Sequence, residues 1–525
     1  MLARSDSALV SSPHPLASHA ALAILADGGN AIEAAIAASA VLCVVYPHMT
    51  GLGGDAFWLL ADAQGNALGI AGAGQAAASL QTFSGAIPMR GPAAMLTCAA
   101  AVDSWRLAWE HSQTCWQGRF GWRELLASAI RFADAGFPVS DSQAFWHRTH
   151  AAQLQPQPGF ASIFEPDQRP PRAGEHMHLP ALADSLRLLA SEGPRDFYEG
   201  RLAGRLAQAL QDAGSVLSAQ DLASCRAEYV TPLRIGYRDG EALNLPPPSQ
   251  GLSSLQILGM LDRFDLRRLP ESGAEHVHLQ VEAVKLALAE RNALLGDIDR
   301  APVLDALLSH AHLARMAAAI DPVQAHAWPF EGQPADTVWL GVRDANGNCV
   351  SLIQSLFHDF GSGVVLGDTG ILWHNRGAAF RPDLEHPNGI APGRRPLHTL
   401  NPAMYFQGGK PRLLYGSQGG DGQPQTQTQI LTRIIDFDMD PWTALCRPRF
   451  LLGRGFLDTR DNLKLEADFD PAVIEQLRQR GHNIGLLEPL DPATGQAGVI
   501  RIHADGHVDG AHDPRGAGRA LGMPR

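Results

Sequence analysis

The sequence predicts an α+β protein, with a mainly helical first part and short antiparallel strands in the last third of the chain. Apolar residues recur at helical spacing in several segments before residue 330, whereas short apolar runs separated by Asn-Gly, Gly-Gly and Asp-Gly turns follow residue 337. No Pro/Gly/Ser-rich linker, low-complexity tract or fixed-period repeat interrupts the 525 residues. The pattern alone indicates helices combined with an antiparallel sheet.

The first two predicted helices are alanine-rich and cover residues 15–27 and 31–44. Between them, glycine closes the first helix and Asn30 caps the second. Clear helical periodicity recurs in six further segments: residues 122–135, 182–189, 202–213, 253–261, 274–295 and 425–435.

A β-hairpin is predicted immediately after a loop that ends at Asp336. Its first strand covers residues 337–344, its turn reads Ala-Asn-Gly-Asn at residues 345–348, and its second strand covers residues 349–356. Thr337 therefore opens a strand.

Composition argues against two classes of partner. The chain has 42 Lys and Arg against 54 Asp and Glu, a net charge of −12, and the two signs are mixed along the sequence. Such a pattern disfavours nucleic-acid binding and a basic membrane face.

The longest apolar stretch, residues 34–46, is too short to span a bilayer, and the first seven residues lack the apolar core of a secretory signal.

The expected compartment is therefore the cytoplasm, and the cysteines fit this expectation. They are scattered, without a CxxC pair, and most lie among apolar neighbours, so they are interpreted as buried thiols: Cys43, Cys98, Cys115, Cys225, Cys349 and Cys446.

Thr337 has the chemistry of a nucleophile if the peptide bond before it is cut. Its hydroxyl would then stand beside a free α-amine, whose reference pKa of about 7.7 to 8.0 suits a base near neutral pH. The same hydroxyl can first attack the Asp336 carbonyl and form an ester that water opens. Most Asp-Thr pairs before a strand are ordinary caps or turns, and the local sequence leaves both interpretations open.

Motifs along nearly the whole chain extend this interpretation. An opening signature covers residues 12–18, 25–35 and 45–55, and later motifs lie at residues 246–251, 360–363, 367–372, 395–400, 416–420 and 513–516. In content and order they resemble the γ-glutamyltranspeptidase family of N-terminal-nucleophile hydrolases. Many ordered matches make a strong signal where a single motif is weak.

The resemblance implies a four-layer α/β/β/α sandwich, in which one compact domain is built from two fragments of the same chain. Residues 1–336 would form the large fragment and residues 337–525 the small fragment, which begins at the nucleophile. It also implies that Gly419 and Gly420 supply backbone N–H groups to an oxyanion, and that Ser355 supports Thr337. From the residues alone, a plain glycine turn and a solvent-facing serine stay open as alternatives.

Positions that hold a γ-glutamyl head group in the family differ here. The arginine for the α-carboxylate falls on Leu80, the Asp and Asn for the α-amine fall on Ala379 and Phe357, and the paired serines become His398 and Thr399. A buried charge left unpaired costs several kcal/mol, which argues against glutathione as the substrate.

A closer resemblance, carried by residues 46–55, 353–356, 375–377, 398–400 and 422–427, is to the branch of the family that contains oxamate amidohydrolase and glutathione-hydrolase-like proteins. It implies cleavage of a small carboxylate-bearing amide through an acyl-enzyme, with oxamate as the first candidate. Arg376 is the expected carboxylate anchor and Arg90 a second choice, because arginine binds carboxylates bidentately. Further expected substrate-binding residues are Gln354, Asn375, His398 and Thr399.

Other functions stay open: a γ-glutamyltransferase or glutathione hydrolase, a cephalosporin-type acylase, transfer to an amine, and a non-catalytic relative. No cofactor or metal is expected, since the His276-x-His278 spacing turns one ring away on a helix and His176-x-His178 would share a face only in a strand. The loop at residues 51–55 lacks the third glycine of a dinucleotide motif. Expected partners are the amide substrate and the two fragments; a homodimer is left open.

Overall fold

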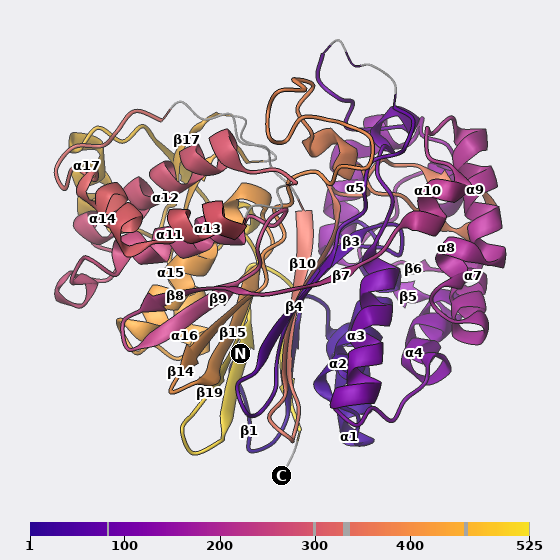
Figure 1. Ribbon diagram of the computed structural model, residues 1–525, viewed down its shortest axis with the longest axis horizontal. Helices are drawn as coiled ribbons and strands as arrows, with labels where there is room; N and C mark the ends of the chain where they lie inside the picture. The colour runs from indigo at the N-terminus through magenta and orange to yellow at the C-terminus, as the bar shows by residue number, and fades with distance from the viewer. Residues whose placement is uncertain (81–82, 84, 298–300, 329–335, 456–459, 524–525) are drawn as a thin grey trace.

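The computed structural model describes residues 1–525 except 81–82, 84, 298–300, 329–335, 456–459 and 524–525. Within these residues, two large antiparallel sheets pack face to face, and helices cover the outer face of each sheet (Figure 1). This arrangement confirms the predicted α+β class and the four-layer sandwich.

The first sheet contains the predicted hairpin at its centre, with every neighbouring pair of strands antiparallel. Its order is β21 (Arg519–Gly522), β2 (Leu9–Ser12), β10 (Asp336–Arg343), β11 (Cys349–Phe357), β3 (Asp55–Ala61), β4 (Ala67–Gly72) and β7 (Glu228–Val230).

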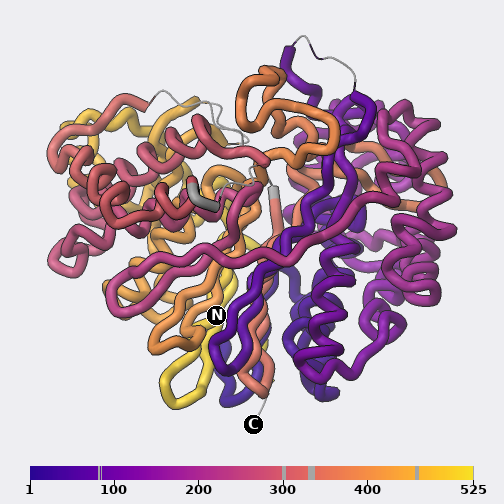
Figure 2. The backbone as a smooth tube through the Cα atoms, viewed as in Figure 1, coloured from indigo at the N-terminus to yellow at the C-terminus, as the bar shows by residue number. Residues whose placement is uncertain are grey.

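The second sheet is also antiparallel throughout. Its order is β1 (Ala3–Ser5), β20 (Val508–His512), β19 (Ala497–Ile502), β15 (Lys410–Ser417), β14 (Ala403–Gln407), β9 (Gly240–Asn244) and β8 (Leu233–Tyr237). Both sheets contain strands from before and after residue 336, and the tube view shows these distant segments side by side (Figure 2). The two predicted fragments therefore share one core.

Side chains that alternate along a strand place one face of β10 against the helices and the other face against the second sheet. Along β10, Val338, Leu340 and Val342 face the helices, whereas Trp339 faces the other sheet. Glycines in the second sheet make room for the Trp339 ring: a Cβ built at Gly498 would lie 2.2 Å from Trp339 Cζ3. The buried indole N–H donates to Ser351 Oγ at 2.9 Å.

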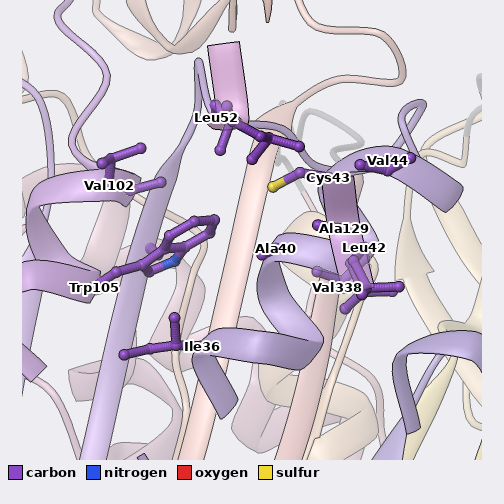
Figure 3. Packing of buried hydrophobic residues seen from close by; sticks show 14 of the residues in the cluster. Ile36, Ala40, Leu42, Cys43, Val44, Leu52, Val102, Trp105, Ala129 and Val338 are labelled. Carbon is purple, nitrogen blue, oxygen red and sulfur yellow. The ribbon is translucent and has the colours of Figure 1, made fainter. Parts of the chain in front are cut away.

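Helices on the first sheet pack around the fully buried, alanine-rich α2, whose small side chains allow close contact with the strands (Figure 3). Asn30 caps α2 as predicted, accepting hydrogen bonds from the N–H groups of Ile32 and Glu33. This layer contains α1 (Pro15–Ala26), α2 (Ala31–Val45), α3 (Ala101–Cys115), α4 (Trp122–Ala135), α5 (Asp141–Leu154), α6 (Phe160–Phe164), α7 (Pro180–Glu192), α8 (Asp196–Glu199), α9 (Arg201–Ala213) and α10 (Ala219–Ser224).

Helices on the second sheet form the opposite outer layer, together with a small sheet of β16 (Phe450–Gly453), β17 (Asn462–Glu466) and β18 (Ile484–Leu487). The helices are α11 (Gly251–Leu261), α12 (Ala274–Leu294), α13 (Ala301–Leu307), α14 (His310–Ala318), α15 (Gln423–Ile435), α16 (Pro441–Cys446) and α17 (Pro471–Gln479).

The predicted helices are confirmed, most to within two residues at each end. The mainly helical interpretation of residues 120–330 was incomplete, because β7, β8 and β9 lie there and extend both sheets. The interpretation of all six cysteines as buried was also wrong, since Cys115 is exposed and Cys446 half-buried, although all six are free thiols. Among the residues described, none of the helices is long and apolar enough to cross a membrane.

Candidate active site

Thr337 lies at an irregularity in the central hairpin. Asp336 pairs with Phe357 and Val338 with Gln354, so Thr337 alone faces two residues of β11, Ser355 and Leu356. Such a bulge re-aims a side chain at the end of a strand. Thr337 is fully buried, and its Oγ1 accepts a hydrogen bond from Gln423 Nε2 at 3.3 Å.

A glycine turn precedes Gln423 by three residues, between the end of β15 and the first residue of α15. Gly419 and Gly420 both have positive φ, +119° and +53°, which glycine adopts without steric cost. Among the described residues, neither of their N–H groups donates to a protein acceptor. Two free N–H groups at a helix N-terminus are suited to binding negative oxygen.

Gln250, a buried residue for which the sequence suggested no role, fixes the position of this turn by hydrogen bonds. Its Nε2 donates to the carbonyl oxygens of Gly420 at 2.9 Å and Thr399 at 2.7 Å, and its Oε1 accepts from Arg291 at 2.6 Å. Arg291 also contacts Asp421 at 2.5 Å. These contacts fix Gly420 relative to Thr399.

Arg376 is a buried cation without a protein hydrogen-bond partner at either Nη atom, as far as the described residues go. Its guanidinium lies over the Phe357 ring, 4.0 Å from the centroid, and Phe357 in turn pairs with Asp336. Burial lowers the pKa of Arg376 to about 9, against the opposite effect of the Asp55 carboxylate, so the side chain is charged at neutral pH.

Arg376 lines a cavity of about 300 Å³, together with Thr399, whose Oγ1 is also buried without a partner among the described residues. Phe357 and Ala379 form part of its wall, and Asp421 borders it. The cavity thus extends from the cation to the segment that carries the glycine turn.

His398 and His374 flank the buried carboxylate of Asp55. Asp55 Oδ2 lies 3.3 Å from His374 Nδ1 and 3.5 Å from His398 Nε2. His374 Nε2 lies 3.1 Å from the Thr97 carbonyl oxygen. Burial alone would raise the pKa of Asp55, but the contacts with His374, His398 and the Ala100 N–H together outweigh burial, and the pKa falls to about 2.

His398 is neutral. Burial, assisted by the charge of Arg376, holds its pKa well below the usual value. Arg376 therefore supplies a positive charge to this cluster, and His398 adds none.

The remaining predicted site residues are distributed around this centre. Ser355 lies opposite Thr337, and its Oγ accepts from the Phe357 N–H at 2.7 Å. Gln354 lies outside the cavity, in contrast to its predicted role, because neighbouring strand residues face opposite sides. Its amide contacts Ser39 at 2.5 Å, Thr50 at 2.6 Å and Trp105 at 3.1 Å on the helical side.

Asn375 is likewise occupied by structural contacts. Its Nδ2 donates to the Met89 carbonyl oxygen at 2.8 Å, and its Oδ1 accepts from the His358 N–H at 3.2 Å. Arg90, the second choice for a carboxylate anchor, pairs with Asp359 at 3.1 Å. Both residues therefore shape the loop after β11, and neither lines the cavity, whereas Arg376 does.

One buried cluster has metal-ligand residue types: His278, Glu282 and His482. His278 Nδ1 and His482 Nε2 are 2.8 Å apart, His278 Nε2 faces the Asp321 carbonyl oxygen at 2.7 Å, and the Lys285 ammonium lies 2.7 Å from Glu282. A lysine already neutralises the carboxylate, so this cluster is interpreted as a hydrogen-bond network between α12 and the segment after α17.

Two antiparallel sheets are enclosed by helices, a buried threonine starts a central strand, and its hydroxyl contacts the helix that follows a glycine turn. This arrangement is that of an enzyme of the N-terminal-nucleophile amidohydrolase class. The chain belongs to the γ-glutamyltranspeptidase family, since the family described as Gamma-glutamyltranspeptidase matches residues 17–523. The resemblance seen in the sequence is thereby confirmed.

Similar proteins carry several activities in their names. The oxamate amidohydrolase proenzyme of Klebsiella pneumoniae is 45% identical, over 97% of this chain and 97% of that protein. The glutathione hydrolase-like YwrD proenzyme of Bacillus subtilis is 40% identical over 98% of both. The crystal structure of cephalosporin acylase from Bacillus halodurans has a TM-score of 0.91 and 31% identity, covering 100% of this chain and 97% of that chain.

Proposed function

We propose that the protein hydrolyses the amide of oxamate, through an acyl-enzyme on Thr337, after cutting its own chain between Asp336 and Thr337. The observation that carries the proposal is the buried Arg376, which lines a cavity and whose two Nη atoms have no protein partner among the described residues. A buried, uncompensated guanidinium is costly unless a ligand anion pairs with it. The similarity to a protein named oxamate amidohydrolase proenzyme supports the same substrate.

The positive charge of Arg376 suits a substrate with one carboxylate. His398, whose pKa burial holds well below the usual value, adds no charge. Oxamate carries one carboxylate, directly bonded to its amide carbon, and a bidentate guanidinium contact would fix that carbon's position. Thr399 Oγ1 can donate a further hydrogen bond to the same carboxylate.

The cavity wall argues against an α-amino acid head group. Phe357 and Ala379 present apolar atoms where a substrate ammonium would need a carboxylate or amide oxygen. The volume of about 300 Å³ also lies at the small end of the range for small-molecule sites, about 300–1,000 Å³. A small, flat, singly charged amide fits these walls better than glutathione.

Self-cleavage would produce the catalytic terminus. Thr337 Oγ1 attacks the Asp336 carbonyl carbon, the carbon–nitrogen bond breaks, and the hydroxyl proton moves to the nitrogen, which becomes the α-amine. Water then hydrolyses the ester and leaves residues 1–336 and 337–525. Because both sheets contain strands from both fragments, the fragments stay together.

Turnover would repeat the same bond changes on the substrate. The α-amine takes the Oγ1 proton as Oγ1 attacks the amide carbon, while the N–H groups of Gly419 and Gly420 bind the oxyanion. The ammonium gives its proton to the leaving nitrogen, and ammonia departs. Water opens the oxalyl ester and releases oxalate.

A second candidate is an acylase for bulkier amides. A larger cavity of about 520 Å³ reaches Gly419 and Gly422 from the other side of the turn, and its wall includes Tyr46, Phe145 and Trp146. Together with the structural likeness to a cephalosporin acylase, this cavity supports a larger group on one side of the scissile bond.

The test starts with the intact mass of the purified protein, followed by ammonia release from oxamate, glutamate release from glutathione and side-chain release from a cephalosporin. Two fragments that meet at Asp336 and Thr337, with ammonia from oxamate, support the proposal. Activity on glutathione alone, or on the cephalosporin alone, would show that oxamate is not the substrate. An uncut and inactive chain would refute the proposal that the protein is an active amidohydrolase.

We also propose a cytoplasmic location, on the basis of the unpaired cysteines, and treat a homodimer as the alternative to a monomer. Cell fractionation and light scattering of the processed protein test these two points.

A further inference from the structure

Four buried glutamines occupy alternate positions at the start of α15, and three of them brace the helix. Gln425 and Gln429 each accept from a backbone N–H and donate to a backbone carbonyl of β16, at 2.8–3.1 Å. Gln427 donates to the Asn401 carbonyl oxygen at 2.8 Å. Each of these three side chains ties the helix to a neighbouring segment.

Gln423 makes a different contact. Its Nε2 donates to Thr337 Oγ1 at 3.3 Å, while its Oε1 is buried and, among the described residues, without a partner. An unpaired buried amide oxygen costs about 1–3 kcal/mol, and the three bracing glutamines avoid this cost because both ends of each side chain are paired. Gln423 holds the nucleophile hydroxyl at a cost that its three neighbours avoid.

We propose that Gln423 is a catalytic residue that stabilises negative charge on Thr337 Oγ1, during self-cleavage and during turnover. When Oγ1 attacks, it loses its proton to nitrogen; when the ester is hydrolysed, Oγ1 leaves as an alkoxide and regains a proton from water. An N–H donor at Oγ1 lowers the energy of the ionised oxygen in both directions.

The length of the contact agrees with this role. At 3.3 Å the hydrogen bond is weak in the resting chain and shortens as charge develops on Oγ1. An interaction that strengthens in the transition state raises the rate without tightening substrate binding. Gln423 is also the first residue of α15, so the positive end of the helix reinforces the effect.

The inference extends the proposed function, but it does not depend on oxamate, because self-cleavage needs no added substrate. The test compares Gln423→Met with Gln429→Met, which removes a bracing glutamine from the same helix. The rate of chain cleavage is followed by intact mass after expression, and kcat and KM for oxamate are measured on the cleaved protein.

We expect Gln423→Met to slow cleavage and kcat by about 10²–10³-fold, as for loss of one donor to a developing charge, with KM changed less than about twofold. Gln429→Met should lower the unfolding temperature and leave both rates within about threefold of wild type. Cleavage measured alone still decides the proposal if oxamate is not turned over.

Gln423→Glu keeps the side-chain size but replaces the donor with a carboxylate, so it should be at least as slow as Gln423→Met. Wild-type cleavage in either folded Gln423 variant overturns the proposal, as does a rise in KM at unchanged kcat. If Gln423→Met folds poorly, the isosteric Gln423→Glu decides, with its fold checked by circular dichroism.

Discussion

Replacing Arg376 with methionine removes the proposed carboxylate anchor and keeps a side chain of similar length over Phe357. Two charge-assisted hydrogen bonds would be lost, each worth about 1.5–3 kcal/mol. Their sum of about 3–6 kcal/mol corresponds to a loss of roughly 10²–10⁴-fold in kcat/KM for oxamate. Arg376→Lys keeps the charge but loses the bidentate geometry, so its loss should be intermediate.

The same substitution should not destabilise the fold, and this separates an anchor from a structural arginine. Burial lowers the pKa of Arg376 from 12.5 to about 9, which corresponds to roughly 5 kcal/mol against the charged form. No described protein group pairs with its Nη atoms, so methionine removes a cost without breaking a hydrogen bond. The variant should unfold at the wild-type temperature or higher.

The assay is ammonia release over a range of oxamate concentrations, with thermal unfolding measured on the same samples. Arg381→Met is the matched control, because Arg381 borders the same cavity but is exposed and its charge is screened by solvent.

A lowered pKa means that the Arg376 charge is present below about pH 9 and lost above it, so KM should rise above that pH. Wild-type kinetics together with a lower unfolding temperature in Arg376→Met would refute the reasoning.

Three further substitutions test other parts of the structure. Thr337→Ala should leave one intact chain without amidohydrolase activity; two fragments in its mass spectrum would exclude Thr337 as the processing nucleophile. Asp55 has its pKa lowered to about 2 from 3.8, so its charge contributes stability above about pH 4 that is lost as pH falls through 2. The stability difference between wild type and Asp55→Asn, measured by urea unfolding, should shrink by about 2 kcal/mol between pH 5 and pH 2. Gly498→Ala should cost about 1–3 kcal/mol because its Cβ would lie 2.2 Å from Trp339 Cζ3, whereas Gly236→Ala, where a Cβ meets nothing within 4 Å, should be neutral in the same thermal assay.

Local sequence was sufficient to predict the hairpin that carries Thr337. An apolar run, an Asn-Gly turn and a second apolar run form a pattern that depends only on residues close together in the chain. The structure places β10 and β11 where that pattern predicts them. The glycine turn was similarly visible, because adjacent glycines after a strand indicate positive φ. The helix boundaries were accessible for the same reason, as the cap at Asn30 shows.

The face of each strand was not accessible from local sequence. Alternation along a strand predicts that Gln354 and Ser355 point to opposite sides of β11, but it does not predict which side holds the nucleophile. Which side holds the nucleophile depends on which helices cover the first sheet. Helix α2 covers the side on which Gln354 lies, where the Ser39 hydroxyl donates to Gln354 Oε1 at 2.5 Å. A glutamine placed in the predicted site thus belongs to the packing between α2 and the sheet.

Asp55 shows a second limit, since its role depends on residues more than 300 positions away. The pairing of β3 with β11 places Asp55 opposite Ser355, and the loops after β13 (Ile371–Leu372) and before β14 bring His374 and His398 to its free oxygen. No spacing along the chain encodes this cluster. It exists because the central strands of the two predicted fragments are neighbours in one sheet.

The same strand pairing connects the proposed anchor to the proposed cleavage site. Phe357 ends β11 with a φ of +82°, an unusual conformation for a bulky residue. From that position its backbone pairs with Asp336, while its ring lies under the Arg376 guanidinium. The bulge at Thr337 lies next to the Asp336–Phe357 pair, so one irregular strand end carries both the proposed nucleophile and the ring under the proposed anchor. Backbone strain at Phe357 therefore lies beside the strand irregularity at Thr337 and under the proposed anchor Arg376, as is typical of functional sites.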